Sequence, residues 1–189
     1  NGKTPCGYTS YERDFLGWRY LETLEESTTV RLKPLEQGGK GYKIVNEKNS
    51  DEYYILENRQ PIGWDNGLVK LGHGMLVMHV DYLKSSWTSN RVNSDANHQR
   101  LSFIPANNSY IGPYTATSAN ELLNALNGQL YPGTSKNTEL SNTSTPASVV
   151  FNGSYMNKSV CDITEWPNGE ITFKFMPKGQ LGPTNISAI

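Results

Sequence analysis

Two long apolar runs dominate the hydrophobic pattern of this chain. The first covers residues 52–60 and the second covers residues 72–81, and the connector at 61–67 is rich in Pro, Gly and Asn. This pattern predicts two strands joined by a loop. Because both runs are apolar almost throughout, we expect both faces of the pair to be covered and the pair to lie centrally in a sheet.

Shorter apolar or alternating runs predict further strands on either side of this pair. These runs lie at 28–32, 42–45, 101–104, 147–151, 159–164 and 170–175. Pro167, Asn168 and Gly169 predict a hairpin turn between the last two. Polar segments without periodicity predict loops at 82–97, 107–117 and 131–146. The chain should therefore form an antiparallel sheet or sandwich with long loops.

Capping signals predict two short helices. Thr9 and Glu12 fit a capping box at the start of a helix of about two turns. Ser118 and Gly128 suit the two ends of a second helix. Aromatic residues recur at helical spacing along the first helix, and we expect this stripe to pack against the sheet. Its members are Tyr8, Tyr11, Phe15 and Trp18. The expected fold class is mainly β with two short helices (α+β).

Three polar residues stand out near the ends of the two central runs. Side chains alternate between the faces of a strand, so His79 and Asp81 share one face. Glu57 lies near the end of the preceding run. Buried singly, such groups would be costly, so we expect Glu57, His79 and Asp81 to form one hydrogen-bonded cluster. The favoured interpretation is a structural network, and a functional group of titratable residues is the alternative.

Length and composition indicate the size of the domain and the classes of partner that the chain could have. The chain has 189 residues, enough for one domain with a real core, and the Gly/Pro-rich segment 177–189 is expected to be a flexible tail. Charged residues make up only 19%, a polar but weakly charged composition that is common in secreted or cell-surface proteins. The net charge of −1, without a basic stripe, argues against nucleic-acid binding. No apolar run reaches membrane-spanning length.

The residues alone mark no catalytic or metal site. The chain has no H-E-x-x-H, G-x-S-x-G, P-loop or G-x-G-x-x-G motif. His73 and His79 lie about 20 Å apart along an extended strand, too far to share one zinc ion. The segment 91–100 offers oxygen ligands for calcium, but its spacing is not that of an EF-hand, which favours a loop of Asx turns. Cys6 and Cys161 form one disulfide or remain two thiols.

Several motifs nevertheless resemble one family in combination. The central motifs are Tyr-Tyr-Ile-Leu-Glu-Asn-Arg-Gln at 53–60, Gly-Trp-Asp at 63–65, and Gly-His-Gly-Met-Leu-Val-Met-His-Val-Asp at 72–81. The segment 4–18 belongs to the set, as do shorter pieces at 92–93, 98–100, 131–133 and 145–146. In this order they resemble the M6 metallopeptidases, which include the immune inhibitor A peptidases of bacteria. The resemblance runs from Thr4 to about Phe175.

The resemblance implies a secreted zinc peptidase of the zincin type. In that family the helix carrying H-E-x-x-H and a methionine turn precede the segment that resembles 4–18. This chain would then be the C-terminal part of the catalytic region, inactive alone. Residues 1–20 would pack toward the zinc-binding segment, and the β-rich residues 21–176 would form a wall of the catalytic domain. The implied partners are that upstream segment and a protein or peptide substrate, with zinc bound in the full-length protein.

A non-catalytic function is the alternative. A secreted β-sandwich of this composition could bind glycan or protein through exposed tryptophans in loops, because aromatic rings stack well on sugars. The candidates are Trp64, Trp87 and Trp166, together with the tyrosines.

Overall fold

The computed structural model describes residues 5–111 and 115–178 and shows the mainly β fold that the sequence predicts. Its larger sheet has the order β1-β3-β4-β5-β6. These strands are β1 (Glu22–Thr23), β3 (Tyr42–Asn46), β4 (Asn49–Arg59), β5 (Gly74–Asp81) and β6 (Leu101–Phe103). β1 runs parallel to β3, and the other neighbours are antiparallel. The predicted pair, β4 and β5, lies centrally in this sheet.

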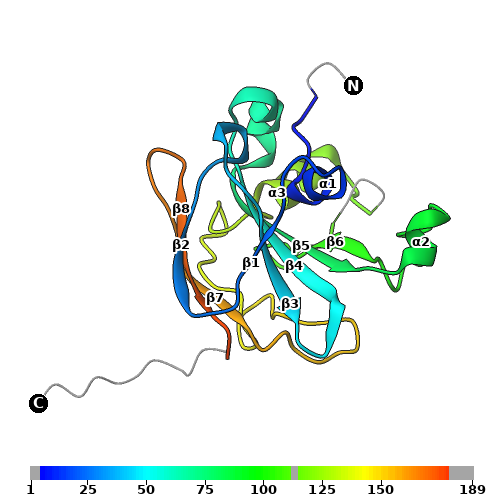
Figure 1. Cartoon of the computed structure of the whole chain (residues 1–189). Coiled ribbons are helices and arrows are strands. Elements are labelled where there is room, and N and C mark those ends of the chain that lie inside the picture. Colours follow the sequence, from blue (N-terminus) through cyan, green and yellow to red (C-terminus); the bar gives the residue numbers. More distant parts are fainter. Residues whose placement is uncertain (1–4, 112–114, 179–189) are drawn as a thin grey trace, which may run out of the picture.

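The smaller sheet has the order β2-β8-β7 and is antiparallel throughout. It contains β2 (Thr28–Leu32), β7 (Ser159–Glu165) and β8 (Ile171–Met176). The predicted hairpin turn between β7 and β8 is confirmed: Trp166 N donates to Glu170 O at 2.8 Å, and Gly169 has a φ of 78°, which favours glycine. Figure 1 shows this sheet, in blue and orange, to one side of the larger sheet.

One continuous core fills the space between the two sheets. β4 and β5 contribute Tyr54, Leu56, Met75 and Val77, which face the smaller sheet. The smaller sheet contributes buried apolar side chains at alternate positions, among them Leu32, Val160, Ile171, Phe173 and Phe175. Side chains from both inner faces thus meet as in a sandwich.

A second, smaller cluster covers the outer face of the larger sheet. Ile55, Met78 and Val80 form its buried centre, and Tyr11 and Trp87 are among the partly buried side chains that pack on it. The prediction that both faces of the central pair are covered is therefore confirmed.

The two predicted helices are present. α1 (Ser10–Phe15) has the predicted capping box: Glu12 N donates to Thr9 Oγ1 and Thr9 N donates to Glu12 Oε2. α3 (Ala119–Asn127) is capped by Ser118, whose Oγ accepts from Glu121 N.

Three short helices were not predicted. These are η1 (Leu35–Gln37), η2 (Gly63–Leu71) and α2 (Lys84–Thr88). η2 occupies the connector between β4 and β5, and α2 lies inside the predicted loop at 82–97. α2 lacks a side-chain cap, but its Trp87 packs on Tyr82 with ring centroids 4.9 Å apart. Tertiary packing rather than local propensity therefore accounts for α2.

The strand predicted at 147–151 is wrong. This segment forms only an isolated bridge between Val149 and Tyr155. Its backbone bonds to nearby turns instead, because Ser148 N donates to Ser141 O and Val150 N donates to Ser154 O. Alternating exposure is present, with Val149 exposed and Val150 buried, but no strand lies beside it to form a ladder in the described part of the chain.

The prediction that the whole aromatic stripe packs on the sheet is also wrong. Only Tyr11 is partly buried there, whereas Tyr8, Phe15 and Trp18 are 53%, 68% and 64% exposed. α1 ends at Phe15, and Gly17 takes a φ of 70°, so the helical spacing that aligned the stripe is lost before Trp18. Trp18 packs edge-on against Tyr8 with ring centroids 5.3 Å apart.

Other predictions concern the chain ends and membrane spans. From residue 179 onward, the predicted tail lies outside the described residues. Within the described ranges, no helix combines the length and the apolarity needed to cross a bilayer.

Candidate functional site

A run of buried, hydrogen-bonded polar side chains lies at the end of β4. Glu57, Asn58, Arg59 and Gln60 are consecutive, and each is less than 9% exposed. Alternation sends Glu57 and Arg59 toward the outer face of the larger sheet and Asn58 and Gln60 toward the smaller sheet. We call these four residues the polar strand end. Buried polar groups need partners, so this segment must bond on both sides.

On the inner side, the polar strand end connects the two sheets. Asn58 Nδ2 donates to Leu32 O at 2.9 Å and to Gly169 O at 2.7 Å. Gln60 Nε2 donates to Asn58 Oδ1 at 3.0 Å and to Glu165 Oε1 at 2.8 Å. The amides thus hold the edge of the smaller sheet in register with β4.

On the outer side, Arg59 lies between two carboxylates. Its Nη1 is 3.2 Å from Glu57 Oε1, and its Nη2 is 2.6 Å from Asp65 Oδ1 of η2. All three side chains are almost wholly buried. Burial raises the pKa of Glu57, while the Arg59 charge and the hydrogen bond from Ser10 N oppose that rise.

This trio also holds the backbone at the start of the chain. Ser10 N donates to Glu57 Oε2 at 2.5 Å, and Gly7 N donates to Asp65 Oδ1 at 2.9 Å. Arg59 Nη2 donates to Gly7 O at 3.0 Å. We call Glu57, Arg59 and Asp65 the N-terminal clamp, because their side chains fix residues 7–10 against the sheet.

The clamped segment presents a hollowed aromatic surface. Tyr8, Trp18 and Trp64 line one cleft of about 700 Å³, with Arg13 and Glu36 beside them. Trp64, from η2, is 65% exposed. Arg13 Nη2 and Glu36 Oε1 are 2.6 Å apart and fix one wall of the cleft. We call Tyr8, Trp18 and Trp64 the aromatic face.

The predicted cluster of Glu57, His79 and Asp81 is wrong as a single group, although all three residues are buried. The register pairs Glu57 with Leu76, so Glu57 lies on the outer face. His79 and Asp81 lie on the opposite, inner face. Alternation fixes faces within each strand but does not say which residues of two strands are opposite each other.

The actual partner of His79 is Glu52, which sequence reasoning missed. His79 Nε2 is 2.9 Å from Glu52 Oε1, which also accepts Phe151 N at 2.7 Å. Asn46 Nδ2 donates to the other oxygen at 2.9 Å. Burial tends to raise the pKa of Glu52, but these hydrogen bonds outweigh it and hold the pKa below its ordinary value. In the register of β4 and β5, Glu52 lies opposite Asp81, so the Glu52 side chain is on the same inner face as His79.

Asp81 has partners of its own. Its Oδ2 is 2.7 Å from His98 Nε2 and 2.5 Å from Arg100 Nη1. The rings of His79 and His98 both contact Phe151, with centroids 4.4 Å and 4.3 Å apart. His79 and Asp81 therefore belong to one inner-face group assembled around Phe151.

The three histidines do not converge. His73 Nδ1 is 2.6 Å from Glu165, His79 pairs with Glu52, and His98 pairs with Asp81. Within residues 5–111 and 115–178, no group of three His, Cys, Asp or Glu side chains is arranged to hold a metal ion. Cys6 is an exposed free thiol and Cys161 a buried one. The described residues therefore do not fit a zinc site.

In the oxygen-rich loop at 91–100, the Asn93, Ser94 and Asp95 side chains bond within the loop or to its next residue. Asp95 Oδ1 accepts from Asn97 N at 2.9 Å, an Asx turn, and Asn93 bonds both the N–H and the C=O of Leu101. The Asx turn agrees with the favoured interpretation of this loop, and calcium binding remains its alternative.

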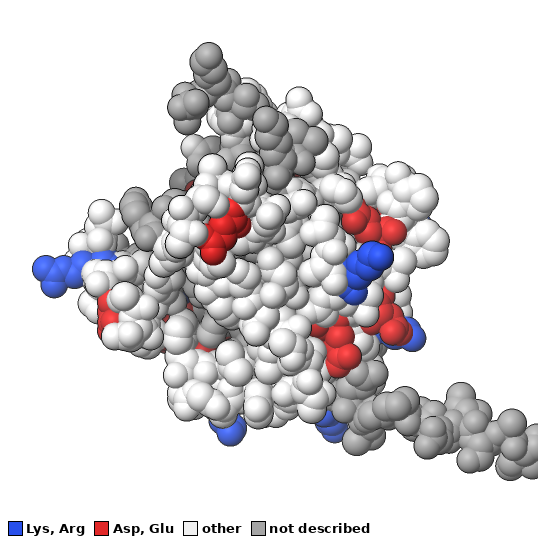
Figure 2. All heavy atoms as spheres, turned by 180° about the vertical axis from the view of Figure 1, so that it is seen from behind, with Lys and Arg blue, Asp and Glu red and all other residues white. Residues whose placement is uncertain are grey.

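Charge on the surface is sparse. Figure 2 shows Lys and Arg side chains standing singly on the face that it presents, without a continuous basic stripe. That distribution agrees with the expectation of no nucleic-acid partner, which remains a prediction from the sequence.

Comparisons with protein-family models and with curated proteins give no match to this chain. The resemblance to the M6 metallopeptidases is therefore carried by the sequence motifs alone.

Removing Arg59 tests the N-terminal clamp. Arg59→Ala leaves two buried carboxylates without their cation, so we expect the free energy of unfolding to fall by about 3–5 kcal/mol. Arg31→Ala is the control, because Arg31 pairs with Glu170 but its side chain is 67% exposed, and its loss should cost less than about 1 kcal/mol. If the two substitutions lower the free energy of unfolding equally in urea denaturation, the N-terminal clamp does not stabilise the fold as expected.

A second pair of variants tests the inner-face group. His79→Ala removes the partner of Glu52 and the ring stacked on Phe151, so we expect a loss of about 2–4 kcal/mol. His73→Ala removes a histidine that is half exposed and should cost less than about 1 kcal/mol. Thermal or urea unfolding measures both, and a neutral His79→Ala would show that this group does not stabilise the fold.

Proposed function

We propose that this chain is the C-terminal portion of the catalytic region of a secreted M6-like zinc metallopeptidase and is inactive alone. Support comes first from the motifs, which follow the order of that family from the aromatic segment through β4 and β5 to the loops beyond. The polar strand end is itself part of the longest motif, at 53–60. In this proposal, the buried side chains of the polar strand end keep the β-rich region, which forms a wall of the catalytic domain, in its folded shape.

The single observation that carries the proposal is the aromatic face. Three large rings, each more than half exposed, gather around one cleft. An exposed apolar patch of this kind is typical of an interaction surface. The clamp beneath it uses buried charges to hold the segment in one position. A surface held so firmly and left so apolar is suited to a partner that docks permanently.

The occupant that we propose is the zinc-binding segment of the same polypeptide. In the M6 family that segment precedes the region resembling 4–18, which carries two rings of the aromatic face. The zinc ligands and the general base would come from the upstream segment, because the described residues do not fit a metal site. This chain would supply a packing surface for that segment and a wall for the peptide substrate.

The second candidate function is a glycan-binding module. The cleft supports it, because Trp64 and Trp18 lie beside the polar Arg13 and Glu36, a mixture suited to sugar stacking. The other predicted tryptophans do not join this cleft. Trp166 is exposed and lines a separate hollow, and Trp87 is partly buried with its Nε1–H donated to Tyr11.

The natural gene product gives the direct test. We expect it to carry H-E-x-x-H upstream of this chain, to bind one zinc ion per molecule, and to hydrolyse casein until a chelator removes the metal. The 189-residue chain alone should do neither. Metal analysis and a casein assay on the natural product and on the 189-residue chain test this proposal. Chelator-sensitive hydrolysis by the shorter chain, or a natural product without a zinc-binding segment, would contradict the proposal.

A substitution in the aromatic face supplies a second test of the proposal. In the isolated chain, Trp18→Ala removes an exposed ring and should cost less than about 1 kcal/mol. In the longer product the same ring would be covered, and its loss should cost about 3–5 kcal/mol. If instead oligosaccharides quench the tryptophan fluorescence of the isolated chain and Trp18→Ala abolishes the quenching, the glycan-binding function is correct.

A further inference from the structure

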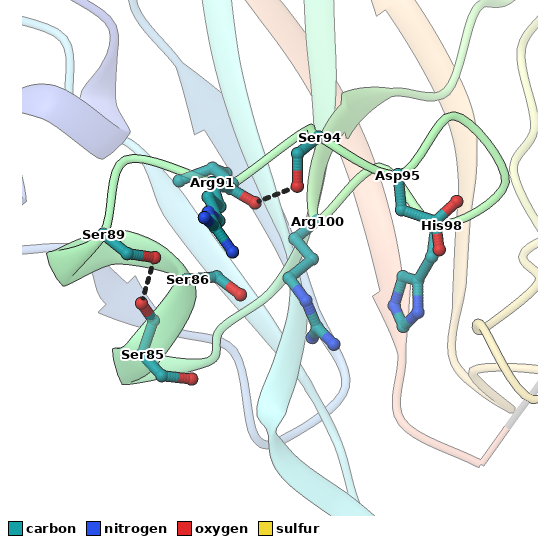
Figure 3. A pocket seen from close by; sticks show the side chains of 9 residues that line it. Ser85, Ser86, Ser89, Arg91, Ser94, Asp95, His98 and Arg100 are labelled. Carbon is teal, nitrogen blue, oxygen red and sulfur yellow. Dashed lines mark hydrogen bonds between the residues drawn. The ribbon is translucent and has the colours of Figure 1, made fainter.

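A polar pocket lies away from the aromatic face, between α2 and the loop that follows it. It is an open hollow of about 330 Å³, lined by four serines and by Arg91, Asp95, His98 and Arg100, among others. Figure 3 shows the Arg91 and Arg100 side chains reaching toward the same space, with the Ser86 hydroxyl turned to it from α2. Cationic donors and hydroxyls thus converge on one hollow.

Arg91 differs from the other arginines. Arg13, Arg31, Arg59 and Arg100 bind carboxylates, and Arg19 binds backbone carbonyls. In the described ranges, the Arg91 guanidinium has no hydrogen bond or ion pair, although its backbone is fixed by Arg91 N donating to Ser86 O at 2.7 Å. Its five N–H donors are therefore available to a ligand at a point where the backbone is ordered.

Arg100 is oriented but not fully occupied. Its Nη1 donates to Asp81 Oδ2 at 2.5 Å and to Asp81 O at 3.3 Å. No bond from its Nε or Nη2 to any described residue is present. Asp81 therefore aims the guanidinium, while the remaining donors are open to a second acceptor.

The residues that line the pocket carry a small net positive charge. Arg91 and Arg100 contribute two positive charges and Asp95 one negative charge. Asp95 Oδ1 already accepts from Asn97 N, and Asp81 lies behind Arg100, bonded to it and to His98. Asp81 is thus paired with Arg100, Asp95 bonds a neutral N–H, and the Arg91 guanidinium has no ionic partner within the described residues.

We propose that this pocket binds a tetrahedral oxyanion, phosphate or sulfate, either as the free ion or as an ester of a small molecule. The two guanidinium groups and the Ser86 hydroxyl provide donors in several directions, which suits four oxygens better than the two of a carboxylate; the Ser89 and Ser94 hydroxyls donate to backbone carbonyls. The volume lies at the lower end of the range for small-molecule sites, so a small ester also fits. The inference does not depend on the peptidase proposal.

Titration calorimetry at low ionic strength tests the site with inorganic phosphate, inorganic sulfate, glycerol phosphate and acetate. We expect saturable binding of the tetrahedral anions and at least tenfold weaker binding of acetate. Arg91→Gln should weaken phosphate binding about tenfold, and Arg91→Lys less, because lysine keeps the charge but loses the fork. Asp95→Asn keeps an oxygen for Asn97 N and removes the opposing charge, so it should tighten binding about threefold.

Lys48→Gln is the matched control, because it removes one exposed positive charge at the turn between β3 and β4. It should leave phosphate binding unchanged. Equal weakening by Lys48→Gln and Arg91→Gln, or no saturable binding of any tetrahedral anion, would overturn the proposal. Tighter binding of glycerol phosphate than of inorganic phosphate would identify an ester as the ligand, and the reverse order would identify the free ion.

Discussion

The ion pairs of Arg59 with Glu57 and Asp65 are the interaction on which the rest of this structure depends. A buried arginine between two buried carboxylates stabilises a fold only if every partner is in place, because each charge left alone costs several kcal/mol. Here Glu57 Oε2 accepts from Ser10 N, Asp65 Oδ1 accepts from Gly7 N, and Arg59 Nη2 donates to Gly7 O, whereas the buried Asp65 Oδ2 has no partner among the described residues. Closing this network therefore requires β4, η2 and the start of the chain to come together.

The next residues along the same strand extend this constraint to the other half of the molecule. Asn58 bonds to β2 and to the β7–β8 turn, so one short stretch of β4 positions the smaller sheet as well as the aromatic segment. Burial of apolar surface is the main driving force of folding, but the apolar core does not specify where the aromatic face lies. That placement comes from the polar strand end, and the proposed docking of a zinc-binding segment rests on it.

Much of the fold was predictable because local signals determine it. Apolar runs identified β4 and β5, and the capping residues Thr9 and Ser118 identified α1 and α3. The polar groups were harder, because Glu57 joins Arg59 while His79 joins Glu52, and only the register between β4 and β5 decides this. The exposure of Trp18 depends on the helix ending at Phe15, and α2 depends on packing by Trp87. Four consecutive polar residues at the end of an apolar strand were the missed signal for the site.

Amide hydrogen exchange at Gly7 and Ser10 tests the central claim, that buried side chains fix the aromatic segment to the sheet. Both amides donate to clamp carboxylates, so their exchange should require opening of the clamp. We expect protection similar to that of the β4 amides, and a loss of protection in Arg59→Ala under conditions where the core remains folded. Exchange of Gly7 and Ser10 at the rate of an unstructured chain, while β4 stays protected, would contradict it.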